Sequence, residues 1–169
     1  METLEDHMLK IPHARAIGMT LVRHDEAGSV VRVPYADHLV GDPDTGVVHG
    51  GVLTALLDNT CGIAVRPPST EQGDYSIATL DLRIDYMGSA EPHKDIYAEA
   101  VCFKRTKNIA FVRATAYQDS PADPIATCVA AFMLGTRNEP RDAGVSTDPR
   151  AAGTRNEPSD PPAATGADA

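Results

Sequence analysis

The chain has 169 residues, of which 42% are hydrophobic and 23% charged, a globular composition with room for one domain of ordinary size. Acidic residues outnumber basic ones by 24 to 15, so the formal net charge is −9. This charge makes nucleic acid and anionic membrane surfaces poor partners for the chain as a whole. With no Trp, three Phe and five Tyr, the chain also has few aromatic side chains on which single-stranded bases could stack.

The cysteines and the hydropathy bear on the cellular location of the protein. Cys61, Cys102 and Cys128 lie in apolar stretches without Cys-x-x-Cys spacing, so we expect small buried core residues and neither a disulfide framework nor a zinc site. The acidic first residues are not followed by the apolar run of a secretory signal, and no window approaches the roughly 18 apolar residues of a membrane span. We therefore expect a soluble, cytoplasmic protein.

The composition changes near residue 138. We expect residues 1–137 to form one domain and residues 138–169 to be a disordered, acidic tail rich in Pro and Ala. Val145 is the only large aliphatic residue of the tail, which therefore cannot bury enough apolar surface to offset the entropy of ordering. The hexapeptide Gly-Thr-Arg-Asn-Glu-Pro at 135–140 recurs at 153–158, which we interpret as an extension by duplication.

The domain begins with strand patterns and continues into a long apolar stretch. Residues 16–23 and 29–34 are short apolar-rich runs separated by a turn-like Asp-Glu-Ala-Gly at 25–28, which predicts a hairpin. A polar loop is expected over 35–46. Residues 49–65 are apolar nearly all round, open with Gly-Gly and end before Pro-Pro, so they predict a helix in the centre of the core.

From residue 76 the hydrophobic period becomes two. Thr79, Asp81, Arg83 and Asp85 alternate with apolar residues, which predicts a half-buried strand whose polar positions, Thr79 included, share one face. Three more strands are expected at 96–103, 109–117 and 125–134. The order of two strands, one helix and four strands predicts an α+β fold, a curled antiparallel sheet around one central buried helix.

The start of the helix is a candidate site. Gly50 and Gly51 would let another molecule approach the backbone, and the unpaired N–H groups of the first turn could hold a developing oxyanion. A tight turn that needs positive φ is the alternative interpretation. His49 enters the helix and could bond either to the backbone or to a substrate. No other His pairs with a carboxylate at metal-ligand spacing, so we expect no metal.

Asp58 is the second candidate. It lies seven residues after Gly51, about two helical turns, and its neighbours on that helix face are small. An ionisable side chain in an apolar helix is rare unless it is paired or functional. We expect either a carboxylate that acts as base or nucleophile, or a buried Asp satisfied by backbone donors.

These residues resemble a known family. His49-Gly50-Gly51 with Asp58 nine residues after the histidine, followed by the strand at 78–87, is similar to the hotdog-fold acyl-CoA thioesterases of the phenylacetic-acid-degradation (PaaI-like) type. The resemblance covers roughly residues 15–135. It implies a hotdog fold and hydrolysis of an acyl-CoA to a free acid and CoA. It also implies a homodimer or homotetramer with the site between subunits, and no cofactor, because CoA is part of the substrate.

The resemblance also implies residue roles. Gly51, with Gly50 beside it, would polarise the thioester carbonyl, and Asp58 would attack it or activate the attacking water. Thr79 would orient that water or the carboxylate, and His49 would lie near the thioester. The basic residues Lys104, Arg105 and Lys107 would bind the phosphates of CoA, although a short charge run is also typical of a solvated hairpin.

One position departs from the family. The residue six before the histidine is often Asn, which helps to hold the carbonyl, whereas here it is Pro43, which has no side-chain donor. Either the glycine amides hold the carbonyl alone or the loop is reshaped. Two alternatives therefore stay open: a hotdog protein that binds acyl-CoA without catalysis, and a hydratase or dehydratase acting on an enoyl thioester through Asp44 and His49.

Overall fold

The computed structural model describes residues 4, 8, 10–68 and 76–136. The expected tail at 138–169 lies outside these residues, so the tail and its boundary at residue 137 stay predictions.

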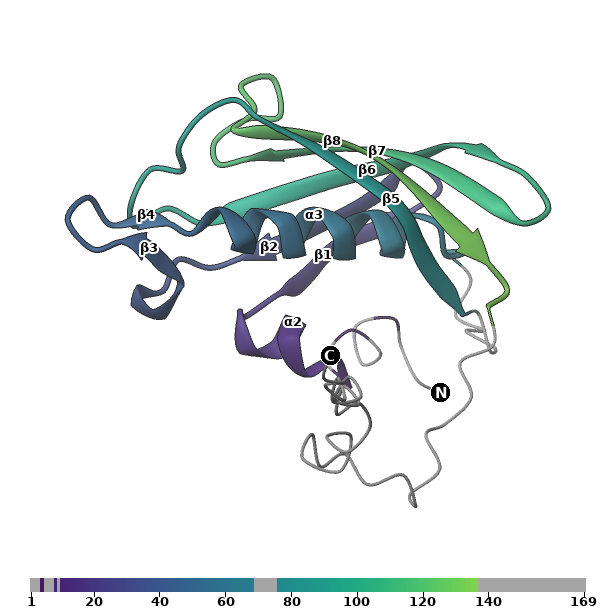
Figure 1. The fold of residues 1–169 in the computed structure, drawn as a ribbon, viewed down its shortest axis with the longest axis horizontal. Coiled ribbons are helices and arrows are strands. Elements are labelled where there is room, and N and C mark those ends of the chain that lie inside the picture. The colour runs from purple at the N-terminus through teal and green to yellow at the C-terminus, as the bar shows by residue number, and fades with distance from the viewer. Residues whose placement is uncertain (1–3, 5–7, 9, 69–75, 137–169) are drawn as a thin grey trace, which may run out of the picture. The chain divides into compact units, whose positions relative to one another are not determined.

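A curved antiparallel sheet of six strands, in the order β1-β2-β6-β7-β8-β5, holds the helix α3 (Gly50–Ala64) on its concave face (Figure 1). This is the predicted arrangement of a sheet curled around one helix. The strands are β1 (Thr20–Asp25), β2 (Gly28–Val33), β5 (Ile77–Tyr86), β6 (Ile96–Arg105), β7 (Ile109–Tyr117) and β8 (Ala126–Leu134).

The predicted hairpin forms at the start of the sheet. Asp25 pairs with Gly28, and the Asp25 carboxylate accepts a hydrogen bond of 2.8 Å from the Ala27 N–H across the turn. Gly28 has a φ of 135°, and a Cβ there would lie 2.3 Å from the carbonyl oxygen of Ala100 on β6. Only glycine allows the chain to turn this close to the neighbouring strand.

Four short elements were not predicted. Pro12 is the first residue of the helix α2 (Pro12–Ala16), where its missing N–H costs nothing. The expected polar loop contains a 3-10 turn, η1 (Asp37–Leu39), and a ribbon of β3 (Val40–Asp42) with β4 (Val47–Val48). Strands of three and two residues are too short to show a hydrophobic period.

The sheet approaches α3 closely because it turns small side chains toward it. Leu53, Leu56 and Leu57 on the helix are at most 4% exposed. Large helix side chains facing small strand side chains fill such a core densely. Seven of the eleven buried residues of β6, β7 and β8 are alanines, namely Ala98, Ala100, Ala110, Ala114, Ala116, Ala126 and Ala130.

The central helix leaves one stripe uncovered in the protomer. Gly51 is exposed, and Thr54, Ala55, Asp58 and Asn59 are partly exposed. The apolar pattern of the sequence does not reveal this open stripe, because small residues such as Gly and Ala occur at both buried and exposed positions. The stripe carries the candidate site.

The cysteines largely meet the expectation of core residues. Cys61 and Cys128 are buried with their sulfur atoms 3.6 Å apart, and Cys102 is partly exposed. The thiol hydrogen bond to Cys128, together with burial, raises the pKa of Cys61, so this thiol stays protonated.

None of the helices that the structure describes has the length and apolar character that a membrane crossing requires.

Candidate active site

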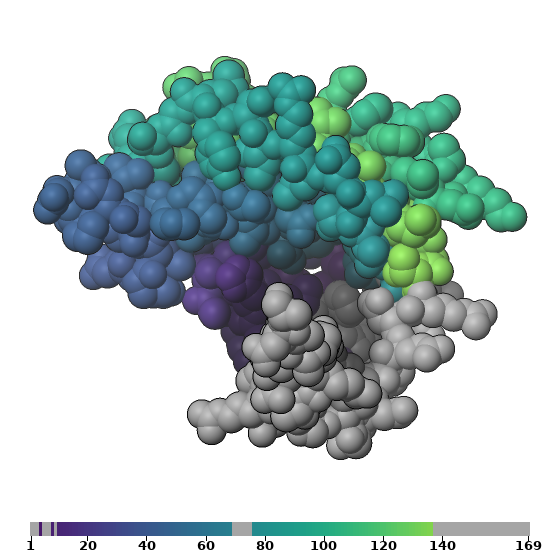
Figure 2. Space-filling view, in the orientation of Figure 1, coloured from purple at the N-terminus to yellow at the C-terminus, as the bar shows by residue number. Residues whose placement is uncertain are grey.

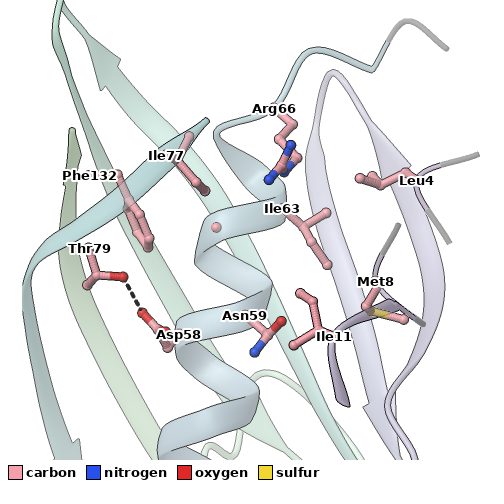
Figure 3. Close-up of a pocket in the computed structure, with 11 residues that line it drawn as sticks. Leu4, Met8, Ile11, Asp58, Asn59, Ile63, Arg66, Ile77, Thr79 and Phe132 are labelled. Carbon is pink, nitrogen blue, oxygen red and sulfur yellow. Dashed lines mark hydrogen bonds between the residues drawn. The ribbon is translucent and has the colours of Figure 1, made fainter. Parts of the chain in front are cut away.

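Asp58 and Thr79 are brought together from two elements. The Thr79 hydroxyl, on β5, donates a hydrogen bond of 2.9 Å to Oδ1 of Asp58 in the third turn of α3 (Figure 3). A hydroxyl donor to a carboxylate fixes the carboxylate's orientation and leaves its second oxygen for another partner. Asp58 is partly exposed, so that oxygen can be reached from outside the protomer.

A β-bulge places Thr79 on the helix side of the sheet. Thr79 pairs with Phe132 and Asp81 pairs with Ala131, the next residue on β8, so Leu80 is an extra residue in β5. A bulge inverts the alternation of faces beyond it. The expectation that Thr79 shares a face with Asp81 is therefore wrong: Thr79 lies on the face of buried Phe132, whereas Leu80 is 51% exposed.

The Asp58–Thr79 pair opens into a pocket of about 260 Å³. Its floor is one face of α3, and its walls come from β5 and β8 on one side and from Leu4, Met8 and Ile11 on the other (Figure 3). Most of the lining is apolar. The residues are Leu4, Met8, Ile11, Asp58, Asn59, Gly62, Ile63, Arg66, Ile77, Thr79 and Phe132.

His49 caps the start of α3. Its Nδ1 atom accepts a hydrogen bond of 2.9 Å from the Gly51 N–H, the amide that the resemblance assigns to the thioester carbonyl. The Gly50 carbonyl accepts hydrogen bonds from the hydroxyls of Tyr86 (3.3 Å) and Thr54 (3.2 Å). The first turn is thus held by side chains of both α3 and β5. Of the two roles expected for His49, a bond to the backbone is the one seen in this structure.

The two candidate halves of the site are far apart within one protomer. Gly51 and Asp58 lie seven residues apart on one helix, a separation of about 10.5 Å along the axis. A reacting carbonyl must lie about 3 Å from both its nucleophile and its oxyanion donor. One protomer therefore cannot bring Gly51 and Asp58 to the same carbonyl.

Comparison with known proteins identifies the family of the chain. Residues 45–125, which include the helix start, Asp58 and Thr79, match the family model of the thioesterase superfamily. A solved structure from Pseudomonas aeruginosa is 46% identical, with a TM-score of 0.67 over 76% of this chain and 94% of that one. The chain belongs to the thioesterase superfamily.

Other known proteins are similar to this chain in fold or over part of the sequence. A structure of the phenylacetic acid degradation protein PaaI from Thermus thermophilus is 21% identical, with a TM-score of 0.60 over 72% of this chain and 97% of that one, which supports the hotdog fold. A medium/long-chain acyl-CoA thioesterase, YigI of Salmonella typhimurium, is 23% identical over 74% of this chain and 86% of its own length. A Halobacterium salinarum protein named as a candidate esterase is 31% identical over 50% of this chain, which spans only 55% of that protein.

In this thioesterase-superfamily chain the basic residues lie at the opposite end of α3 from Gly51. The Arg105 guanidinium donates a hydrogen bond of 2.9 Å to the carbonyl of Val65, the C-cap of α3. This contact is structural, since a cation at a helix C-terminus satisfies an orphan carbonyl. Lys104 and Lys107 are exposed beside it.

The residues of the hydratase alternative do not share a pocket. Asp44 and Pro43 line a surface pocket with Tyr35 and Gly46, whereas His49 lines a different one with Gly51.

Within the described ranges, no group of three or more His, Cys, Asp or Glu side chains could hold a metal ion.

Sequence reasoning missed several residues of the site. Tyr86 and Thr54, whose hydroxyl oxygens lie 2.7 Å apart, brace the helix start, and Met8 and Phe132 line the pocket. Tyr86 carries a signal, because it ends the strand that also holds Thr79. Met8 carries none, since its role depends on where the N-terminal region packs.

Proposed function

We propose that the protein is an acyl-CoA thioesterase that hydrolyses its substrate to a carboxylic acid and CoA. The observation that carries the proposal is the Asp58–Thr79 hydrogen bond at the mouth of an apolar pocket, within the segment that matches the superfamily. The name of the YigI relative supports acyl-CoA as the substrate class. The reaction requires only water and a carboxylate, so we propose no cofactor, and we keep the cytoplasm as the expected location.

In the proposed reaction, Asp58 either activates a water molecule or attacks the thioester carbonyl itself. In both cases the carbonyl oxygen gains negative charge, which the N–H groups at the positive end of a helix stabilise. Thr79 holds the Asp58 carboxylate in position. Gly51 would supply the oxyanion donor once its N–H turns from His49 to the substrate, with Gly50 leaving room for the approach.

We also propose that the site forms between two protomers. β5 is one of the two edge strands of the sheet, and its outer side has no paired strand in the described part of the chain. An exposed edge of ten residues is a template for pairing with another strand. Leu80, Tyr86 and Met87, on or next to this edge, are 51–62% exposed, and β5 runs across the surface that faces the viewer in Figure 2.

A twofold axis would complete the site. If two β5 strands pair antiparallel, the α3 helices that accompany them also run antiparallel, because each helix keeps its orientation to its own strand. The start of one helix then lies beside the later turns of the other, so Gly51 can face Asp58 of the partner subunit. The same operation brings Lys104 and Lys107 toward the glycine end of the partner helix, where the CoA phosphates would lie.

The experiment measures thiol release from a panel of acyl-CoA substrates. Replacing Asp58→Asn should lower kcat by at least about a hundredfold, since the amide can neither accept the proton of water nor attack. The circular dichroism spectrum and oligomeric state should not change. Asp81→Asn, on the opposite face of the same sheet, is the matched control and should keep full activity. Unchanged hydrolysis by the Asp58 variant would refute the assignment.

One observation favours a second function, an acyl-CoA binder without catalysis. The Gly51 N–H already donates to His49, and Pro43 supplies no further side-chain donor near the helix start. A protein that kept this hydrogen bond would bind the thioester without polarising it. Tight binding of acyl-CoA by the wild type with no release of thiol would establish this alternative.

A further inference from the structure

We propose that the pocket over α3 holds the acyl group as an extended aliphatic chain of medium length, and that Gly62 determines whether such a chain fits. This inference rests on the proposed function, since it takes the Asp58 end of the pocket as the place of the thioester. It adds a substrate class and a specificity-determining residue.

The floor of the pocket is one continuous stripe of the helix. Asp58, Gly62 and Arg66 are spaced by four residues, so they follow one another along the same face of α3 and its last turn. Asn59 and Ile63 lie beside them. Figure 3 shows Asp58 and Arg66 at opposite ends of this stripe.

The length of the stripe fits a medium chain. Eight residues separate Asp58 from Arg66, which is about 12 Å along a helix axis. With C–C bonds of about 1.5 Å, an extended chain gains a little more than 1 Å per carbon, so this distance accommodates roughly eight to ten carbons. The space between the two ends is walled by Ile77, Phe132 and Met8, which suit a saturated chain.

Gly62 lets the β5–β8 wall of the pocket lie close to the helix floor. Glycine is unfavourable inside a helix, and this one has no positive φ that would require it. A Cβ at position 62 would lie 3.3 Å from Cδ1 of Ile77 and 3.7 Å from a ring carbon of Phe132. Both of these residues line the pocket, so a side chain at position 62 must displace them and thereby change the width of the pocket.

The test compares chain lengths in three glycine variants. Wild type should hydrolyse octanoyl-CoA with a higher kcat/KM than butyryl-CoA or phenylacetyl-CoA. Gly62→Val should lower the octanoyl-to-butyryl ratio of kcat/KM by about tenfold or more, the scale on which a few misplaced carbons change specificity. Gly62→Ala, whose methyl meets only the flexible end of Ile77 and a ring edge, should give a smaller change in the same direction.

Gly88→Ala is the matched control, because a Cβ there meets nothing within 4 Å. Its octanoyl-to-butyryl ratio should equal that of wild type. The inference is overturned if both Gly62 variants, shown to be folded by their melting temperatures, keep the wild-type ratio, or if wild type prefers phenylacetyl-CoA. If Gly62→Val does not fold, the Gly62→Ala ratio decides.

A binding measurement separates this inference from the proposed function. If wild type releases no thiol from any acyl-CoA, the proposed hydrolysis fails. Calorimetric titration with octanoyl-CoA then tests the pocket alone. Gly62→Val should weaken binding by about tenfold, and Gly88→Ala should not change it. Equal affinities in the three proteins would refute the role of Gly62.

Discussion

The Gly51 N–H donates a hydrogen bond to the imidazole of His49, two residues earlier in the chain. This contact makes His49 the N-cap of α3, although Asn, Asp, Ser and Thr are the usual residues there. The imidazole occupies the direction from which a substrate carbonyl would reach the same N–H. His49 therefore links the stability of the helix start to the availability of the proposed oxyanion donor.

Replacing His49 separates these two effects. His49→Ala should lower the free energy of unfolding by about 1 kcal/mol, the usual cost of a lost N-cap, whereas His49→Asn should keep the cap. Because the imidazole also lies at the proposed thioester position, we expect the Asn variant to regain stability but not turnover. Chemical denaturation and thiol release measure the two properties. Full activity of His49→Asn would limit His49 to a structural role.

Thr79 is expected to act by positioning Asp58. Thr79→Val removes the hydroxyl and keeps the shape, so kcat should fall by about ten- to a hundredfold, as expected for a hydrogen bond to a charged group worth about 1.5–3 kcal/mol. Thr79→Ser keeps the donor and should retain most of the activity. KM should change little in both variants. A Thr79→Val enzyme with wild-type kcat would contradict the positioning role.

The shared site predicts complementation between inactive subunits. Asp58→Asn removes the carboxylate, and Gly51→Val places a side chain within 2.9 Å of the His49 ring and should disrupt the helix start. Each homodimer should be inactive. A heterodimer purified through two different tags keeps one intact site of two, so it should show about half of the wild-type activity. A heterodimer as inactive as its parents would contradict a site built from Gly51 of one protomer and Asp58 of the other.

The basic residues should divide into two classes. Arg105→Ala removes the hydrogen bond to the Val65 carbonyl and should lower the free energy of unfolding by about 1 kcal/mol. Lys104→Ala should leave stability unchanged and raise KM for acyl-CoA, more strongly at low salt, because exposed charges are screened. Melting temperatures and salt-dependent KM values test the division. A salt-independent KM in the Lys104 variant would exclude a role in binding phosphate.

His24 should make stability depend on pH. Burial lowers the pKa of His24 below its usual value of 6.5, and its Nδ1 lies 2.8 Å from the hydroxyl of buried Ser29. The unfolded chain therefore binds this proton at a higher pH than the folded chain does. The contribution of His24 to stability is complete above about pH 6.5 and is lost as the pH falls toward the lowered pKa.

The measurement is the melting temperature between pH 7.5 and about 5. His24→Gln should flatten this part of the profile, because glutamine does not titrate. His13→Gln, a substitution at an exposed position, is the control and should keep the wild-type slope. Equal slopes in all three proteins would show that other groups cause the pH dependence.

The sequence by itself determined the type and order of the main elements and singled out Asp58 as a candidate. The strand from Ile109 to Tyr117 has the predicted limits, and α3 (Gly50–Ala64) differs from its prediction by one residue at each end. Such elements are predictable because a sustained hydrophobic period specifies both their type and their buried face. Asp58 was identifiable because a carboxylate is costly inside an apolar helix.

Only the tertiary structure decided which groups meet. The bulge at Leu80 turns Thr79 toward Asp58, and a change of face at a single residue leaves the alternation in the sequence intact. The pocket depends on Met8 lying beside a helix that begins more than 40 residues later in the chain, a proximity that no local pattern encodes. Gly62 is likewise indistinguishable from other small residues until Ile77 and Phe132 are placed opposite it.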